Sequence, residues 1–210
     1  MVNKLIVWDE LKSEKYLEKH LNVVKSYVYS VVEFNKLNKL NLNYPLFIKI
    51  ISDNAIHKVK AKAINEILNE QKFLKEKINI VKRAKELNAK KIIIQEKIYG
   101  NELIIGVKED LKFGKILMIG IGGKHAEQIK DVSIRALPIK KQDLTLMISN
   151  LKSKVITLDI DIDNLWLFIS KLLKFLKTKE GKNIKFMDLN PVILDYNSKK
   201  PIIVDARIYV

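Results

Sequence analysis

The stretch ELIIGVKEDLKFGKILMIGIGGKHAEQIKDVSIRALPI, residues 102–139, decides the fold of this chain. Its two apolar runs, ELIIGVK and KILMIGI, are separated by a short turn, which predicts two adjacent strands. The second run ends in Gly122-Gly123, and glycine lets backbone N–H groups approach an anion closely because it has no Cβ. A glycine pair after a strand is more often only a turn, so by itself it indicates a phosphate site weakly.

The composition is that of a folded domain. A chain of 210 residues can form one domain or two small lobes around a cleft, and its 48% of apolar residues can supply a core. We find no run of roughly 18 apolar residues, the length that a membrane helix needs, and the acidic residues near the start argue against a signal peptide. The absence of cysteine excludes disulfides and thiolate metal sites, and it fits a cytoplasmic protein.

The formal net charge of +15 at pH 7 raises the question of nucleic-acid binding. Nucleic-acid-binding proteins cluster their charge on one face and use arginine at many contacts. Here the lysines are spread along the whole chain, and the only arginines are Arg83, Arg135 and Arg207. We therefore interpret the charge as a lysine-rich solvated surface, whose positive field would attract ADP, ATP and phosphate.

Hydrophobic periodicity predicts alternating helices and strands, and hence an α+β architecture with mixed sheets. The apolar face of the helix at 163–178 is compatible with a membrane surface, but such a stripe far more often packs against a sheet. The predicted helices are 9–20, 29–40, 63–88 with an interruption near Lys75, 141–150 and 163–178, and strands include 46–51 and 90–98.

The C-terminal segments IKFMDLNPVIL and PIIVDARIYV predict a β-hairpin around NSKK. With a turn centred between Asn197 and Ser198, the numbers of paired residues sum to 395, so Asn190 lies opposite Asp205. Directly opposed Cβ atoms are about 4.5–5.5 Å apart, which lets an amide oxygen and a carboxylate converge on one Mg²⁺ ion. This geometry is compatible with a metal site at the pair.

The same register places Asp188 opposite Arg207, on the same face of the hairpin. We interpret this pair as an orienting ion pair rather than as a further metal ligand. Read from these residues alone, all four would by default form a charged solvent face with cross-strand pairing. The prediction depends on the register, because a slip by one residue would send these side chains to opposite faces.

These segments together resemble the ATP-grasp β subunit of ADP-forming acyl-CoA (acetate–CoA) synthetases, a family related to succinyl-CoA synthetase. Residues 102–139 match ELIIGV-x-x-D-x-x-FG-x-x-x-M-x-G-x-GG followed by E-x-x-KDVS-x-R-x-x-P. The segments DLNP and VDAR match the family's D/E-x-NP and VDA-R elements, whose Asn and Asp carry the metal. The resemblance spans residues 10–210 and is strongest from residue 90 onward.

The resemblance implies an ATP-grasp fold, with two lobes, 1–98 and 99–210, enclosing a nucleotide cleft. It implies an enzyme subunit in the reaction acyl-CoA + ADP + Pi ⇌ carboxylic acid + CoA + ATP, with ATP/ADP and Mg²⁺ as cofactors. CoA chemistry and the acyl preference would belong to a separate CoA-binding α subunit, in an α2β2 heterotetramer. Neither nucleic acid nor a membrane is an expected partner.

Lys49 lies inside an apolar strand, where an ammonium group must either reach solvent or meet an anion. As a compact point charge it suits a phosphate, and it matches the nucleotide-binding lysine of the family's P-x-x-x-K strand. The resemblance also places Glu96 at the hinge where the backbone recognises adenine, and Glu102 near the ribose. Read alone, each glutamate would be an ordinary surface residue. The implied nucleotide-binding residues are Lys49, Glu96, Glu102, Gly122 and Gly123, and the implied metal ligands are Asn190 and Asp205.

His57 is the implied catalytic residue. It lies in ISDNAIHK, which resembles the family element I-S-x-D-I-x-H-K, whose histidine is a transient phosphate carrier. Neutral imidazole is nucleophilic near pH 7 and suits this task. The resemblance does not assign His125, and it leaves open whether Arg135 assists the phosphate path or a subunit interface.

The residues after His57 depart from the family pattern. The family continues with Asp-Gly-Gly, whereas residues 59–64 read VKAKAI. Lys60 and Lys62 could replace backbone contacts to phosphate with charge. The alternative function is therefore a nucleotide-binding regulatory or scaffolding subunit with a degenerate phosphate loop.

Overall fold

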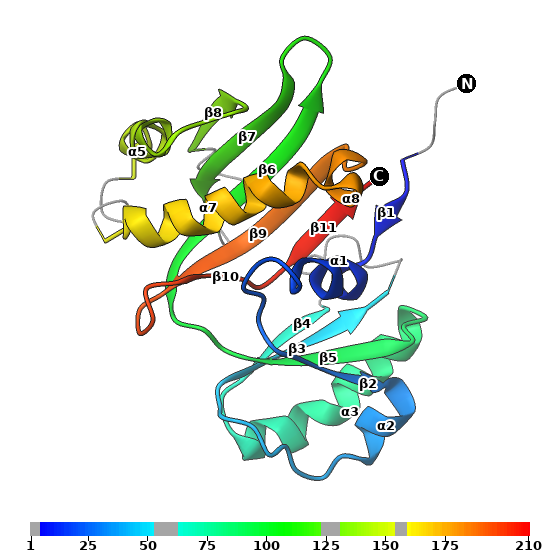
Figure 1. The fold of residues 1–210 in the computed structure, drawn as a ribbon. Helices are drawn as coiled ribbons and strands as arrows, with labels where there is room; N and C mark the ends of the chain where they lie inside the picture. The colour runs from blue at the N-terminus through cyan, green and yellow to red at the C-terminus, as the bar shows by residue number, and fades with distance from the viewer. Residues whose placement is uncertain (1–4, 53–62, 123–130, 154–158) are drawn as a thin grey trace. The chain divides into compact units, whose positions relative to one another are not determined.

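The chain forms two compact units, which we describe separately. The small unit is Val24–Ile98, and the large unit combines the chain up to Val23 with Tyr99–Val210. Both contain helices and a β-sheet, which confirms the predicted α+β class. The computed structural model (Figure 1) describes residues 5–52, 63–122, 131–153 and 159–210.

Two features of this organisation differ from the sequence-based expectation. We expected mixed sheets, whereas all pairings between the named strands are antiparallel, and the parallel contact is an isolated bridge between Val23 and Ile203. The expected boundary between residues 98 and 99 lies where the chain passes from one unit to the other. The segment before Val24, however, groups with the large unit, because its strand pairs there and Leu17 and Leu21 lie in that unit's core.

The small unit is a four-stranded sheet in the order β2-β5-β3-β4, with helices packed against one face. Its elements are β2 (Ser26–Ser30), α2 (Val31–Lys36), β3 (Leu46–Ile51), β4 (Ile64–Ile67), α3 (Glu70–Glu86) and β5 (Lys91–Glu96). Ile48 and Ile94 face the helices, and the rings of Phe34 and Phe73 meet edge to face with centroids 6.0 Å apart. This leaves the alternate residues of β3, including Lys49, on the opposite face.

The predicted helix at 29–40 is wrong at both ends, and local hydrogen bonds explain the start. Ser30 ends strand β2 and caps helix α2: its Oγ accepts from the Glu33 N–H at 3.1 Å, and the Glu33 carboxylate accepts from the Ser30 N–H at 2.8 Å. This reciprocal capping box defines the first turn of a helix. The helix ends at Lys36, because Leu37 is extended.

The predicted helix at 63–88 combines a strand with a helix. Residues 64–67 form the edge strand β4, which pairs with β3. The sheet context overrides the local helical pattern of this segment. Helix α3 begins after Asn69, whose side chain accepts from the Lys72 N–H at 2.9 Å. The helix then runs to Glu86 without the predicted interruption near Lys75.

The large unit is a sheet in the order β1-β11-β9-β6-β7-β8, and β10 also pairs with β9. Its strands are β1 (Val7–Trp8), β6 (Gly100–Asp110), β7 (Gly114–Ile121), β8 (Val132–Ala136), β9 (Phe186–Asp195), β10 (Pro201–Ile203) and β11 (Ala206–Tyr209). Its helices are α1 (Glu10–Leu17), α5 (Lys141–Ser149), α7 (Ile162–Leu176) and α8 (Lys179–Lys182). The two strands predicted from residues 102–121 are therefore the hairpin β6–β7.

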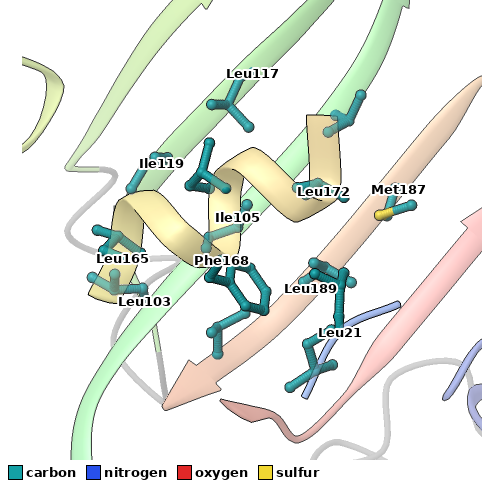
Figure 2. Close-up of a cluster of buried hydrophobic side chains, with 14 of the residues drawn as sticks. Leu21, Leu103, Ile105, Leu117, Ile119, Leu165, Phe168, Leu172, Met187 and Leu189 are labelled. Atoms are coloured by element: carbon teal, nitrogen blue, oxygen red, sulfur yellow. The ribbon is translucent and has the colours of Figure 1, made fainter. Parts of the chain in front are cut away.

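Helix α7 confirms the predicted helix at 163–178 and its packing against a sheet. It begins after Asp161, whose side chain accepts from the Asn164 N–H at 3.0 Å, rather than after Asp163. Its apolar face lies on β6, β7 and β9, as Figure 2 shows. The packed residues include Leu165, Phe168 and Leu172 from α7 and Leu103, Ile105, Leu117, Ile119, Met187 and Leu189 from the sheet. Among the described residues, no helix is long and apolar enough to cross a membrane.

Replacing a buried residue of α7 should destabilise the large unit. Leu172 is fully buried against the sheet, so Leu172→Ala is expected to lower the free energy of unfolding by about 2–5 kcal/mol through lost burial and a cavity. Leu167 lies on the same helix but is exposed, so Leu167→Ala should change it by no more than about 0.5 kcal/mol. Urea denaturation of both variants measures the difference. Equal effects would contradict the observed packing of α7.

Candidate functional site

The C-terminal hairpin has the predicted register. Asp188 pairs with Arg207 in β9–β11, and Leu194 pairs with Pro201 in β9–β10, so paired numbers sum to 395 along both segments. Between these segments the Asn190 N–H donates to the Asp205 carbonyl at 3.1 Å. The backbone thus brings Asn190 and Asp205 opposite one another.

Strand β9 carries a β-bulge at Asn190. Leu189 and Val192 are both fully buried, so two residues instead of one separate successive inward side chains. At the same level the register between β6 and β9 shifts between Leu103 and Ile105. Bulges re-aim side chains and are frequent beside active sites, because the extra residue leaves the regular alternation.

The strand segment facing β9 matches this bulge. Ile203 at the end of β10 and Ala206 at the start of β11 are both buried, and two residues, Val204 and Asp205, separate them. Because both sides of the hairpin carry one extra residue at the same level, the overall register is kept. Asp205 therefore stays opposite Asn190 on the face that does not contact α7.

We call this face, defined by Glu102, Asp188, Asn190 and Asp205, the acidic face. All four side chains are half-buried. Glu102 is assigned to it because its neighbour Leu103 points into the core against α7, and side chains alternate along a strand. The acidic face thus collects carboxylates from β6 and from both sides of the hairpin, in a chain whose net charge is +15.

Asp188 is the electrostatically perturbed member of the acidic face. Its Oδ1 atom is buried and has no hydrogen-bond partner among the described residues. Burial raises the pKa of Asp188, the nearby charge of Asp205 raises it further, and the Arg207 guanidinium opposes both effects. Arg207 therefore compensates the charge of Asp188 only in part, which modifies the predicted orienting ion pair.

A divalent cation fits these residues. Mg²⁺ prefers oxygen ligands and commonly takes only one or two from the protein, with water and phosphate oxygens completing its shell. Asn190 and Asp205 offer an amide and a carboxylate oxygen from opposed positions, and a cation beside them would stabilise the ionised form of Asp188. Among the described residues there is no group of three or more His, Cys, Asp or Glu side chains that could hold a metal without such help.

Toward β8, the side of the sheet that carries the acidic face becomes apolar. Gly106 on β6 pairs with Asp188 on one side and with Met118 on the other, and Met118 in turn pairs with Ile134. One row across the sheet therefore changes from a carboxylate to apolar side chains. Such a surface can contact an apolar ring and a charged group of the same ligand.

Gly122 serves the fold differently from the expectation. Its N–H donates to the Glu102 carbonyl at 2.8 Å, so this group is already used and is not available to an anion. A Cβ at this position would lie 2.6 Å from the Leu103 carbonyl carbon, so the absence of a side chain is required for packing. Gly123, the second glycine of the pair, lies outside the described residues.

The expected nucleotide residues of the small unit lie in strands as predicted. Lys49 is on β3, paired with Ile93 and Ile64, and is only 4% exposed. Glu96 ends β5, and its carboxylate accepts from the Asn43 N–H at 3.0 Å. Glu96 thus anchors the segment that precedes β3, a role that the sequence did not indicate.

His57 lies outside the described residues, together with Lys60, Lys62 and His125.

Sequence reasoning missed Asp131, whose buried carboxylate accepts hydrogen bonds from the N–H groups of Lys152 and Ser153 at 2.9 Å each. The signal was an acidic residue directly before a strand, in the polar run KDVS.

Gly122→Ala should destabilise the large unit because the new Cβ would collide with the backbone of Leu103. We expect a loss of about 1–3 kcal/mol in the free energy of unfolding, as for other overpacked sites. Gly106→Ala is the matched control, since its Cβ would meet only the flexible methyl end of Met118 at 3.0 Å. Chemical denaturation compares the two, and a larger loss for Gly106→Ala would contradict the close approach at Gly122.

The turn of the hairpin should make stability depend on pH. The Asp195 carboxylate accepts from the Ser198 hydroxyl at 2.6 Å and from the Ser198 N–H at 2.9 Å, and these bonds lower the pKa of Asp195. A carboxylate whose pKa is lower in the folded than in the unfolded state stabilises the protein at pH values above its pKa in the unfolded state. This stabilisation is lost as the pH falls through its pKa in the folded state. The melting temperature of Asp195→Ala should therefore lie further below wild type at pH 7 than at about pH 3. An equal difference at both pH values would refute this linkage.

Comparisons with known proteins identify a family and several relatives. A family model described as an ATP-grasp domain matches residues 9–210. The chain is 34% identical over 186 residues to the acetate–CoA ligase [ADP-forming] II subunit beta of Pyrococcus furiosus, covering 80% of this chain and 75% of that protein. It is 32% identical over 179 residues to the 4-hydroxybutyrate–CoA ligase [ADP-forming] of Nitrosopumilus maritimus, covering 80% of this chain but only 25% of that protein.

Solved structures show the same fold. A crystal structure of a Pyrococcus horikoshii protein, PH1788, aligns with a TM-score of 0.79 at 30% identity, covering 96% of this chain and 90% of that one. The dinucleotide-forming acetyl-coenzyme A synthetase 1 of Ca. Korarchaeum cryptofilum, in complex with coenzyme A and Ca-AMPCP, aligns with a TM-score of 0.80 at 28% identity, covering 97% and 93%. Another structure of that synthetase contains Mg-AMPPCP, with its phosphohistidine segment pointing towards the nucleotide-binding site; it aligns with a TM-score of 0.74 at 27% identity, covering 97% and 92%.

Proposed function

This chain belongs to the ATP-grasp domain family, and from this we propose that it is the nucleotide-binding β subunit of an ADP-forming acyl-CoA ligase. The overall reaction is acyl-CoA + ADP + Pi ⇌ carboxylic acid + CoA + ATP. One observation carries the proposal: the matched bulges put Asn190 opposite Asp205 on the acidic face, and this pair offers two oxygen ligands to the Mg²⁺ ion of a nucleotide. The β-subunit relatives and the nucleotide complexes of the similar synthetase support it.

On this proposal Asn190 and Asp205 hold the Mg²⁺ ion of the nucleotide. What Mg²⁺ supplies when bound is neutralisation of the charge on the phosphate oxygens. Asp188 remains on the acidic face as a charged neighbour oriented by Arg207. Glu102, on the same face, accepts hydrogen bonds from the ribose hydroxyls, since a carboxylate is a strong acceptor for them.

In the small unit, Lys49 contacts a nucleotide phosphate with its ammonium group, and the backbone beside Glu96 recognises adenine. Gly123 donates its N–H toward the phosphates. Gly122 contributes only the close backbone approach that sets the strand end, because its own N–H is bonded to Glu102. These assignments rest on the sequence resemblance together with the strand positions described above.

His57 carries the phosphoryl group. In the direction of ATP synthesis, a terminal phosphate oxygen of ADP attacks the phosphorus of phosphohistidine, the P–O bond forms, the P–N bond breaks, and the imidazole nitrogen keeps the electron pair. Lys60 and Lys62, which follow His57, supply positive charge where the family has an Asp-Gly-Gly element. The phosphohistidine segment of the similar synthetase supports this step.

The partner is a CoA-binding α subunit, in an α2β2 assembly in the cytoplasm. The chain spans 75% of a β-subunit relative but only a quarter of the single-chain ligases that it matches, so most of such a ligase lies outside the region matched here. The acyl preference belongs to that other part.

The second candidate is a regulatory or scaffolding subunit that binds nucleotide without phosphoryl transfer. The segment 59–64, VKAKAI, favours it, because it lacks the glycines that let a loop close over phosphates. Both candidates predict nucleotide binding, and only the first predicts a phosphorylated histidine.

Phosphate incorporation distinguishes the two candidates. The purified chain is mixed with Mg²⁺ and γ-labelled ATP, with and without a candidate CoA-binding subunit, and wild type is compared with His57→Ala. We expect an acid-labile, base-stable label that is absent from the variant, because phosphoramidates are stable to base. Calorimetric binding of Mg·ATP without any label would instead support the regulatory subunit.

Loss of the metal ligands should weaken nucleotide binding only when Mg²⁺ is present. For Asn190→Ala and Asp205→Asn we expect the affinity for Mg·ATP to fall by more than about 10-fold, since even indirect disturbance of a metal site commonly costs that much. Asp163→Asn, which removes an acid on α7 from the opposite side of the sheet, should leave the affinity unchanged. Calorimetry with and without EDTA measures this, and equal losses in EDTA would show that the two residues do not act through a metal.

A further inference from the structure

Two charged side chains meet across a central strand of the small unit. The Lys97 ammonium donates to the Glu66 carboxylate at 2.6 Å, and the two side chains are 29% and 33% exposed. Glu66 lies on the edge strand β4 and pairs with Phe47 of β3, whereas Lys97 directly follows β5 on the other side of β3. The Lys97 side chain therefore crosses β3, with its ammonium 6.0 Å from the centroid of the Phe47 ring. This half-buried, charge-assisted contact joins the two strands that flank β3.

The ion pair lies on the same face of the sheet as Lys49. Ile48 and Ile94 face the helices, and side chains alternate along a strand, so Phe47 and Lys49 project from the opposite face. Glu66 shares this face, because directly paired residues of neighbouring strands point to the same side. This is the face on which the proposed function places the nucleotide phosphates.

The end of β5 is also held by its neighbouring residue and by its backbone. The Glu96 carboxylate accepts from the Asn43 N–H at 3.0 Å, and the Lys97 N–H donates to the Pro45 carbonyl at 2.9 Å. Two adjacent side chains thus fix this strand end to different parts of the small unit, the segment before β3 and strand β4. The backbone that carries these two side chains is the part that the proposed function assigns to recognition of adenine.

We propose that the Lys97–Glu66 ion pair positions the backbone at the end of β5 for recognition of the adenine base. This inference rests on the proposed function, which places the base at this backbone. Backbone donors and acceptors recognise a ligand well only when supporting contacts hold them within about 0.5 Å of the productive position. The pair holds this strand end before the nucleotide arrives, so that less conformational freedom is lost on binding. Lys97 and Glu66 are therefore positioning residues, which act through the backbone and need not touch the nucleotide.

A purely structural ion pair would have a different effect on ligand binding. Its loss would loosen the sheet and weaken the contact of Lys49 with phosphate as well as the contacts to the base. A positioning role affects the base alone, because Lys49 is held within β3 by its pairing with Ile64 on one side and Ile93 on the other. The two roles differ in whether a ligand that lacks the base is affected.

The test compares Mg·ATP with inorganic tripolyphosphate and Mg²⁺, which offers the phosphates without the base. Calorimetry measures both affinities for wild type, Lys97→Met, Glu66→Gln and the double variant. Lys97→Met keeps an apolar stem over Phe47 and removes the charge, and Glu66→Gln keeps the shape of the side chain. We expect each single variant to bind Mg·ATP at least about 5-fold more weakly, within the range of coupling between residues of one ion-pair network, and to bind tripolyphosphate like wild type. The double variant should lose about as much as one single variant, because each of these already breaks the pair.

The control variant is Lys185→Ala in the large unit. Lys185 also joins two strand segments through an ion pair, with Glu109 at 2.5 Å. Glu109 lies two positions after Val107, a core residue packed under α7, so this pair is on the side of the sheet opposite the acidic face. Lys185→Ala should bind both ligands like wild type, and the melting temperature of every variant shows that it is folded.

Several results would overturn the positioning role while the proposed function stands. These are unchanged or increased affinity for Mg·ATP in both single variants, equal losses for Mg·ATP and tripolyphosphate, additive losses in the double variant, or an equal loss in Lys185→Ala. If wild type bound neither ligand, the proposed function would fail, and the positioning role would fail with it.

Discussion

The large unit depends on one constraint: strand β9 must stay in register with its neighbours on both sides while its inward face changes from odd to even positions. Leu189 and Val192 both pack against the apolar face of α7, although they are three positions apart in the sequence and a regular strand would place them on opposite sides of the sheet. A bulge meets this need by adding one residue. The segment β10–β11 carries one extra residue at the same level, so its pairing with β9 continues in the same register on both sides of the bulge.

The bulge also determines where the chemistry can occur. The extra residues, Asn190 on one strand and Asp205 on the other, cannot face the core, because a polar side chain buried there without partners would destabilise the fold. They therefore emerge together on the acidic face. The packing requirement of the core and the pairing of two oxygen donors are consequences of the same local geometry.

Charge is distributed in opposite ways over the molecule. Lysines give the chain its charge of +15, whereas three carboxylates, Glu102, Asp188 and Asp205, share one face of one sheet. The long-range positive field attracts anionic nucleotides and phosphate, and the local acids suit the cation that accompanies them. At the turn of the β6–β7 hairpin the two acids have partners of their own: Glu109 pairs with Lys185, and the Asp110 carboxylate accepts from the turn backbone.

The sequence by itself determined the elements whose signals are local. The hairpin register followed from centring the turn between Asn197 and Ser198, and the observed pairs have the same sum of 395. Helix α7 followed from a long apolar stripe of period 3.6. Only the tertiary structure decided the rest. Residues 64–67 became a strand because β3 offered an unpaired edge, and the Gly122 N–H was taken by Glu102 because two strands approach closely there. Both outcomes depend on partners distant in sequence, which no local pattern encodes.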